Sequence, residues 1–287
     1  MRSSRRMGRL AAAAAMTILC GCANAKSIEP VAAPLRDLDA AEIEARVAHV
    51  RQDPLGYLRE VAKKCSTLEQ YTVTFIRQER RGFGLLQRLY EPERIACWFR
   101  RSPFSIRMKW LDEDVKYGES TYVAGQDDDR VRFVPRNGLF GLPPGVVRIR
   151  PATSVTWGES RYPVTDFGLE RLMQRVFKSI EEEGGHVTVS YEGLTCLNGS
   201  DRPLHFVRLE YPPWHKPAPL LELYLDVQTD WPVCSRILFA NGELDGAYVY
   251  QDLNPRVKLT DEHFLLDAER AQAAAAQPTY PQAGSAR

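Results

Sequence analysis

The chain has 287 residues, of which 44% are hydrophobic and 26% are charged, with 38 Lys and Arg against 37 Asp and Glu. If residues 1–21 are removed on export, they take four arginines and no acids with them, and the mature chain is mildly acidic. A mildly acidic chain of mixed charge lacks the basic surface of nucleic-acid-binding proteins, which excludes that class. The apolar content is sufficient for one domain with a sizeable core.

Residues 1–21 have the composition of an export signal. Four arginines precede an apolar run from Leu10 to Leu19, about half the ~20 residues that a membrane-spanning helix needs. The sequence Leu19-Cys20-Gly21-Cys22 resembles the lipobox of bacterial lipoproteins, whose cysteine is lipidated. We therefore predict a lipoprotein signal peptide over residues 1–21 and lipidation of Cys22. The alternative is cleavage at Ala23-Asn24-Ala25, which would release a soluble periplasmic protein.

A lipid at Cys22 would anchor the protein stably, because each buried acyl CH₂ contributes about 0.8 kcal/mol. Ala23 stands where, in well-studied envelopes, an aspartate marks retention at the inner membrane. The resemblance thus implies an outer-membrane lipoprotein that faces the periplasm. Residues 22–52 are expected to form a tether, polar over residues 23–38, and then a short helix over residues 39–51.

A domain is predicted over residues 53–268, and it begins with a helix. Asp53 is placed to cap this helix, and Pro54 suits its first turn. Apolar residues then recur at helical spacing as far as Cys65, which gives the helix one face that packs on another element.

From Glu69 the apolar period changes to two, which is typical of strands. The alternation predicts a strand with one aromatic face over residues 71–76 and a hairpin over residues 95–99 and 104–110. Further strands are expected near residues 120–124 and 130–135. The face opposite the apolar side of the hairpin is basic, and its charges are expected to be solvated on the convex side or at the rim of the sheet. These basic residues are Arg100, Arg107 and Lys109.

Residues 137–160 are rich in Gly and Pro and are expected to form a long loop, with Leu139–Leu142 as a lid, a membrane-touching tip or a segment folded onto the core. A helix follows over residues 165–183, with Thr165 or Asp166 as its cap and Gly184-Gly185 at its end.

Five strands are predicted after this helix, over residues 187–191, 204–211, 220–227, 233–240 and 247–252. The Ala- and Gln-rich residues 269–287 are expected to be a disordered tail.

This order of elements predicts an α+β fold in which helices cover one face of a single curved antiparallel sheet. Two segments, Glu93–Trp110 and Arg161–Leu169, resemble the signature of the exported bacterial proteins known as the domain of unknown function 1571 family. Asn254 and Leu259-Thr260-Asp261 match near the end of that domain, and the resemblance covers roughly residues 55–266.

The family is similar in fold to the periplasmic lipoprotein carrier and its outer-membrane receptor. The resemblance implies an open half-barrel whose concave face, covered by helices, holds acyl chains. This chain departs from the family pattern by its own lipobox and by four further cysteines. Fold resemblance implies architecture more firmly than function.

The apolar strand and helix faces are the candidates for lining such a cavity. The alternative is that the same residues form a closed core. Apolar and polar residues alternate along a strand in the same way in both cases, so the pattern does not separate them. The candidate ligand-binding residues are Tyr71, Val73, Phe75, Phe99, Ile106, Met108, Trp110, Leu172 and Val176.

The remaining polar and sulfur-containing residues indicate no catalytic, metal or cofactor site. The five histidines show no metal-binding spacing, and no serine or cysteine has a recognisable nucleophile motif. The four cysteines after Cys22 either are small buried hydrophobes or form disulfides, in which case Cys196 with Cys234 is the preferred pair, since both belong to the second group of strands.

Together these features predict an anchored periplasmic lipoprotein that binds an acyl chain or a lipid-modified partner in a half-barrel cavity, as a receptor or acceptor. The alternative is an anchored protein- or peptide-interaction module of the envelope that transfers no lipid. An enzyme acting on a lipid or envelope polymer is a minority interpretation, and nothing in the sequence defines the oligomeric state.

Overall fold

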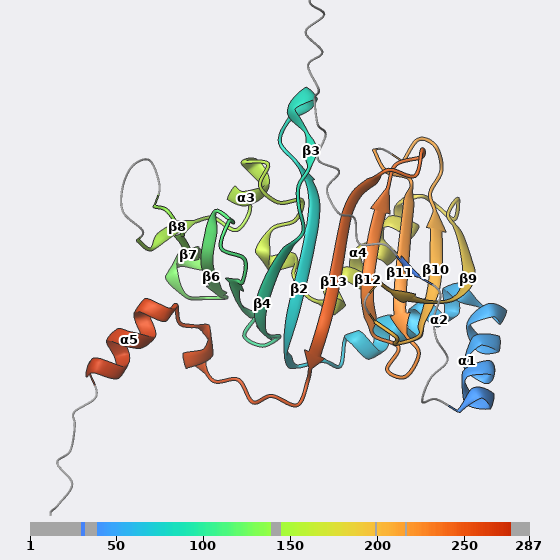
Figure 1. The fold of residues 1–287 in the computed structure, drawn as a ribbon, viewed down its shortest axis with the longest axis horizontal. Coiled ribbons are helices and arrows are strands. Elements are labelled where there is room, and N and C mark those ends of the chain that lie inside the picture. The colour runs from blue at the N-terminus through green and yellow to red at the C-terminus, as the bar shows by residue number, and fades with distance from the viewer. Residues whose placement is uncertain (1–29, 32–38, 139–144, 199, 216, 277–287) are drawn as a thin grey trace, which may run out of the picture.

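The computed structural model describes residues 30–31, 39–138, 145–198, 200–215 and 217–276, and Figure 1 shows their arrangement. Its centre is one antiparallel sheet with the strand order β1-β9-β10-β11-β12-β13-β2-β4-β5-β6-β7-β8, in which β3 pairs only with β2. Within the described residues, the outermost strands β1 and β8 do not pair with each other, so the sheet is open. The predicted α+β fold with one curved antiparallel sheet is confirmed.

The first group of strands comprises β2 (Gln70–Arg81), β3 (Arg88–Leu89), β4 (Glu93–Arg100), β5 (Ser105–Trp110), β6 (Tyr117–Val123), β7 (Val131–Pro135) and β8 (Val147–Ile149). The second group comprises β9 (Thr188–Leu197), β10 (Leu204–Glu210), β11 (Leu220–Asp226), β12 (Pro232–Leu238) and β13 (Leu244–Asn254), and β1 (Pro30–Val31) pairs with β9. The pairing of β13 with β2 joins the two groups into one sheet, since Tyr250 lies opposite Phe75 in the register.

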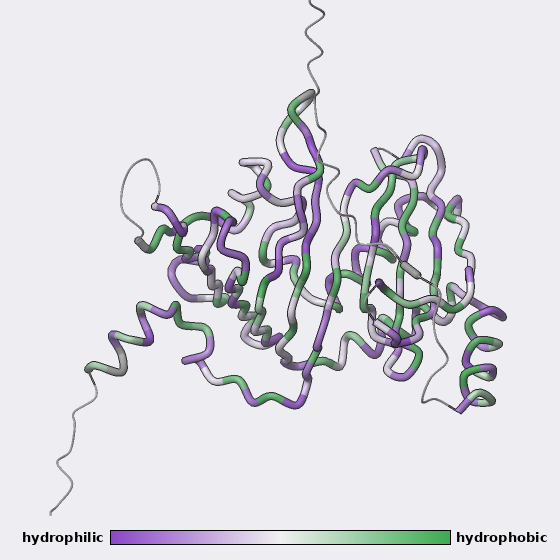
Figure 2. The backbone as a smooth tube through the Cα atoms, in the orientation of Figure 1, coloured by the Kyte–Doolittle hydropathy of each residue, from purple (hydrophilic) through white to green (hydrophobic). Residues whose placement is uncertain are grey.

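Helices α2 (Pro54–Cys65) and α4 (Leu169–Glu182) pack on one face of this sheet, which we call the inner face, and α4 lies behind the strands in Figure 1. Alternate residues of β2, Tyr71, Val73 and Phe75, are buried beneath the helices. Along the strands in Figure 2, hydrophobic residues are interspersed with hydrophilic ones, as expected for a sheet with one covered face. Helix α1 (Ala40–Gln52) contacts α2 and β9.

The predicted start of α2 is confirmed, because the Asp53 carboxylate accepts a hydrogen bond of 2.8 Å from the backbone N–H of Gly56. The predicted cap of α4 is wrong. Val164–Asp166 forms a 3₁₀ turn, and the residue before the helix is Gly168, with a φ of 118°. The sheet supplies the cap instead: the Tyr71 hydroxyl accepts a hydrogen bond from the N–H of Leu169.

The segment predicted as a loop over residues 137–160 contains strand β8 and the short helix α3 (Thr153–Thr156). Its proposed tip at Leu139–Leu142 lies outside the described residues, as do the signal peptide, Cys22 and residues 32–38 of the tether.

The disordered tail predicted from residue 269 is wrong as far as residue 276, because Asp267–Ala276 forms helix α5. A 3₁₀ turn, Asp261–Phe264, leads into it and crosses the outer face of the sheet. There the carbonyl of Phe264, whose side chain is buried, accepts a hydrogen bond of 2.6 Å from the Thr121 hydroxyl. Residues 277–287 lie outside the described part of the chain.

This C-terminal segment also corrects the expectation of a solvated basic face. Arg107 is only 1% exposed: it donates to Asp267 at 2.7 Å and to Glu119 at 2.9 Å, and its guanidinium stacks over Trp98. Arg100 is largely covered and pairs with Asp261, whereas Lys109 remains about half exposed. Carboxylates from α5 and the preceding turn therefore pair with basic side chains that the strand pattern predicts to be solvated.

The four cysteines of the domain are buried thiols, so the disulfide preferred from the sequence, Cys196 with Cys234, does not form in this structure. Burial raises the pKa of Cys65 and of Cys234 to about 12, which keeps both thiols protonated. They are small apolar core residues, which was the alternative open from the sequence.

Candidate ligand-binding cavity

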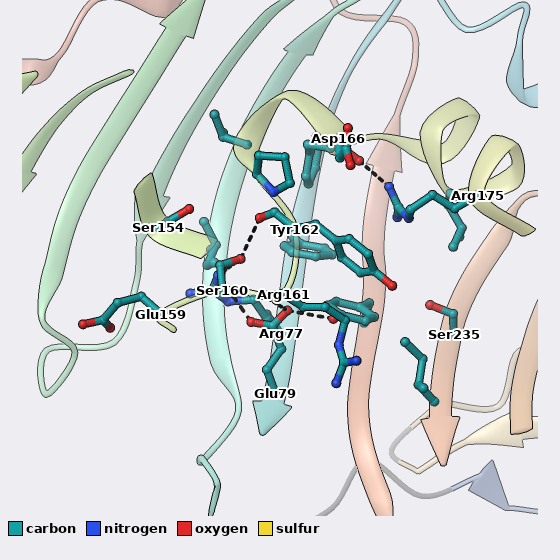
Figure 3. A pocket seen from close by; sticks show the side chains of 18 of the residues that line it. Arg77, Glu79, Ser154, Glu159, Ser160, Arg161, Tyr162, Asp166, Arg175 and Ser235 are labelled. Carbon is teal, nitrogen blue, oxygen red and sulfur yellow. Dashed lines mark hydrogen bonds and ion pairs between the residues drawn. The ribbon is translucent and has the colours of Figure 1, made fainter. Parts of the chain in front are cut away.

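A cavity of about 360 Å³ lies between the inner face of the sheet, helix α4 and the segment over residues 151–167 (Figure 3). Strands of both groups form its floor, and α4 with the 151–167 segment forms its cover. Its lining is mostly apolar and aromatic, and it includes Phe75, Ile95, Met108, Trp110, Tyr117, Phe133, Trp157, Phe167, Leu172, Val176, Tyr211, Leu221, Ile237, Tyr248 and Tyr250.

Helix α4 is held over the cavity at both ends. At its start, Leu169 donates to the Tyr71 hydroxyl of the sheet. At its end, Glu183 accepts hydrogen bonds from Trp214 at 2.8 Å and interacts with His215 Nδ1 at 2.6 Å. The hydrogen bond from His215 lowers the pKa of Glu183, so this contact to the β10–β11 loop is charge-assisted.

The 151–167 segment is attached to the floor by polar contacts. Arg77 donates to the Ser160 hydroxyl at 3.3 Å, and Ser160 donates to the carbonyl of Tyr162 at 2.8 Å. Gly82, at the end of β2, donates its N–H to the carbonyl of Gly158. These contacts fix a segment with little regular structure of its own across the inner face.

Five of the nine candidates named from the sequence line the cavity: Phe75, Met108, Trp110, Leu172 and Val176. The other four, Tyr71, Val73, Phe99 and Ile106, lie in the closed core. The reason is the approach of α4 to the sheet at its first residue. Tyr71 and Phe99 stack with ring centroids 4.7 Å apart, and both lie within 3.5 Å of the Cβ position of Gly168. No space remains between helix and sheet there.

The aromatic lining from the second group of strands and from the 151–167 segment was not among the residues predicted from the sequence. Tyr248 and Tyr250 alternate with Ala247 and Val249 on β13, which is a signal of a covered aromatic face. Trp157, Tyr162 and Phe167 gave no such signal, because residues in an irregular segment have no periodicity.

A buried ionic network lies at the floor. Glu93 accepts from Arg77 at 2.8 Å, from Arg81 at 2.7 Å and from the Trp110 indole at 3.2 Å. Burial alone would raise the pKa of Glu93, but Arg77 and Arg81 outweigh it and lower the pKa to about 2. The carboxylate is therefore ionised at neutral pH, and the network holds the aromatic floor residue Trp110 in place.

Two further pairs extend this network. Glu79 accepts a hydrogen bond of 2.7 Å from the Tyr248 hydroxyl, and Asp245 accepts one of 2.5 Å from Arg161. Glu79 on the floor and Arg161 in the cover both line the cavity, so these charges of its lining are already matched by protein partners.

Within the described residues, no group of three or more His, Cys, Asp or Glu side chains could hold a metal ion. Among the helices in the same described ranges, none is long and apolar enough to cross a membrane.

Residues 68–273 match the model of a protein family described as protein of unknown function (DUF1571). No curated protein matches the chain. Solved structures give similarities of low identity. A crystal structure of MucB is 16% identical over 77% of this chain, with a TM-score of 0.44, and the MucA/MucB complex of Pseudomonas aeruginosa is 18% identical over 75%, with a TM-score of 0.42.

The chain spans 64% and 61% of the lengths of those two structures, less than two thirds in each case. The LolA superfamily protein NE2245 of Nitrosomonas europaea is 9% identical, with a TM-score of 0.33, over 74% of this chain and 97% of its own. At these TM-scores the similarities do not indicate a function for this chain.

Proposed function

The chain belongs to the DUF1571 family, and from its cavity we propose that it binds an acyl chain or a lipid-modified partner, as an outer-membrane lipoprotein facing the periplasm. The observation that carries this proposal is the aromatic and aliphatic lining beneath a helix fixed at both ends. The cavity volume of about 360 Å³ falls in the range of ~300–1,000 Å³ that is usual for small-molecule sites.

The energetics favour an acyl ligand. Each buried CH₂ contributes about 0.8 kcal/mol, so a chain of about ten methylenes gains on the order of 8 kcal/mol before the cost of binding. The association cost of at least ~4 kcal/mol is reduced where the site is preformed. The contacts of α4 and of the 151–167 segment preform this one.

A lipid anchor at Cys22 suits a receptor or acceptor rather than a shuttle, because an anchored domain reaches only the length of its tether. The residue after Cys22 is Ala23 rather than the aspartate that marks retention at the inner membrane, and this supports the outer membrane as the destination. We propose no enzymatic step, since the charged groups at the cavity floor are paired with one another.

Native mass spectrometry with organic extraction, on protein purified from a bacterial envelope, tests the binding proposal. We expect acyl species at close to one per chain. The variant Leu172→Trp fills the cavity and should abolish their retention, whereas Gln174→Trp, on the exposed side of the same helix, should retain them. A wild-type protein free of lipid, with no uptake on challenge, would favour the protein- or peptide-interaction module instead.

The anchor is tested separately. Wild type should fractionate with membranes and carry a diacylglyceryl-modified N-terminal Cys22, and Cys22→Ala should not. An unmodified mature N-terminus at or after Ala23 would instead support the soluble periplasmic form.

A further inference from the structure

One cation of the cavity, Arg175, has no carboxylate partner among the residues that the structure describes. Arg175 lies on α4 one turn from Leu172 and Ser179, so it shares the face of the helix that lines the cavity. Its Nη1 donates to the backbone carbonyl of Asp166 at 2.7 Å, and its guanidinium lies 4.3 Å from the ring centre of Tyr162. Figure 3 shows Arg175 directed from the helix toward Asp166.

The other two arginines that line the cavity are matched by acids. Arg77 pairs with Glu93 at 2.8 Å, and Arg161 pairs with Asp245 at 2.5 Å. Arg175 pairs with none of the carboxylates in the described ranges, and Asp166 offers it only a main-chain oxygen. A guanidinium has five N–H donors, and Asp166 occupies one nitrogen of the three.

An arginine that is partly withdrawn from water gains from an anion, because charge-assisted and bidentate hydrogen bonds are stronger than neutral ones. The apolar lining beside Arg175 would take a hydrocarbon chain attached to that anion. Resting on the proposed function, we infer that Arg175 binds the negatively charged head of an acyl amphiphile, a carboxylate or a phosphate, whose chain occupies the apolar cavity.

Tyr250 supports this assignment. It lines the same cavity, and its hydroxyl makes no hydrogen bond to any described residue, which leaves it available to the same head group. Burial raises the pKa of Tyr250, so its hydroxyl is protonated at neutral pH and can donate a hydrogen bond. The cavity therefore offers an anionic head group both the Arg175 guanidinium and the neutral Tyr250 hydroxyl.

The test compares laurate with 1-dodecanol, which has the same chain length and no charge, by calorimetry on the delipidated protein. We expect wild type to bind laurate more tightly than dodecanol. Arg175→Gln should weaken laurate binding about tenfold or more, which corresponds to about 1.4 kcal/mol, and should leave dodecanol binding unchanged. Arg171→Gln, on the exposed side of α4, is the matched control and should change neither.

The outcomes separate this inference from the proposed function. Equal binding of laurate and dodecanol by wild type would overturn the anion assignment and leave acyl binding intact. An equal loss of both ligands in Arg175→Gln would show that Arg175 only holds the 151–167 segment. Acetate, measured as a third ligand, carries the charge without the chain, and if it bound as tightly as laurate, Arg175 would be a site for a free anion. If neither laurate nor dodecanol bound, the proposed function itself would be overturned.

Discussion

The hydroxyl of Tyr71, on the central strand β2, accepts a hydrogen bond of 3.3 Å from the N–H of Leu169, the first residue of α4. This contact substitutes for a helix cap, because the first N–H groups of a helix have no partner within it. It also brings the start of α4 down onto the sheet, so the cavity opens only beyond that point. The residue between the two elements, Gly168, has a φ of 118°, where a side chain is strained.

We predict that Gly168→Ala destabilises the protein more than Gly185→Ala. Both positions have a positive φ, but only the added Cβ at Gly168 meets neighbours, the Tyr71 hydroxyl at 3.2 Å and the Phe99 ring at 3.3 Å. Strain of this kind costs on the order of 1–3 kcal/mol, and the contacts add to it. Urea denaturation measures the difference, and equal losses in the two variants would show that the close approach of α4 contributes nothing.

The ionic network beneath the cavity predicts a dependence of stability on pH. The pKa of Glu93 in the folded protein is about 2, below its ordinary value of 4.5. A group whose folded pKa is depressed stabilises the fold above the ordinary pKa, and this contribution is lost as the pH falls from about 4.5 toward 2. We therefore expect the free energy of unfolding to fall across that interval.

Glu93→Gln should remove much of this acid dependence and should also destabilise the protein at pH 7, by about 3 kcal/mol, because Arg77 and Arg81 lose their close acid. The two buried arginines then keep only the longer contacts to Glu79, at 3.7 and 3.9 Å. Glu91→Gln, at an exposed neighbouring position, should do neither. Unfolding curves between pH 2 and 7 measure both effects. If the free energy of unfolding of Glu93→Gln fell between pH 4.5 and 2 as steeply as that of wild type, the acid dependence could not be assigned to this carboxylate.

The alternation of apolar residues was enough to predict the curved sheet and its covering helices, since strand and helix periods are local properties. The same pattern could not separate Phe75, which lines the cavity, from Val73, which lies in the core two residues away on the same face. That distinction depends on where α4 touches the sheet, which Gly168 and Tyr71 determine from positions about 100 residues apart in the chain. Arg175 is on the apolar stripe of α4, and the role proposed for it rests on its having no acid partner among the described residues, which only the tertiary structure shows.

The outer face illustrates a second limit of sequence patterns. Arg107 alternates with buried apolar residues, which predicts a solvated side chain, but Asp267, 160 residues later, pairs with it. Phe264 covers the neighbouring Arg100 in the same way. The Ala-rich composition of residues 269–276 indicated disorder because composition does not reveal the acids that attach the segment. Glu269, for example, accepts a hydrogen bond of 2.6 Å from Arg132.

We accordingly predict that Phe264→Ala destabilises the whole domain, by about 3–5 kcal/mol, as expected for a fully buried aromatic residue. Its ring lies 4.8 Å from the Arg100 guanidinium, so the variant also removes a cation–π contact. Glu262→Ala, at an exposed position of the same turn, is the control. Chemical denaturation should show one cooperative transition shifted to lower denaturant in Phe264→Ala, and an unchanged midpoint would mean that the C-terminal segment is not part of the folded unit.

The buried cysteines give a prediction for an exported protein, in which disulfides are chemically permitted. Cys65, Cys97, Cys196 and Cys234 are thiols in the structure, and burial raises the pKa of Cys65 and Cys234 to about 12. Because the thiolate is the reactive form, native protein should resist iodoacetamide at pH 8. Denatured protein, without reductant, should add four carbamidomethyl groups to the domain, as measured by intact mass. If Cys196 and Cys234 are joined in the periplasm, the count would instead be two until a reductant is added. The second group of strands would then carry the disulfide that the sequence analysis preferred in the case that any pair forms.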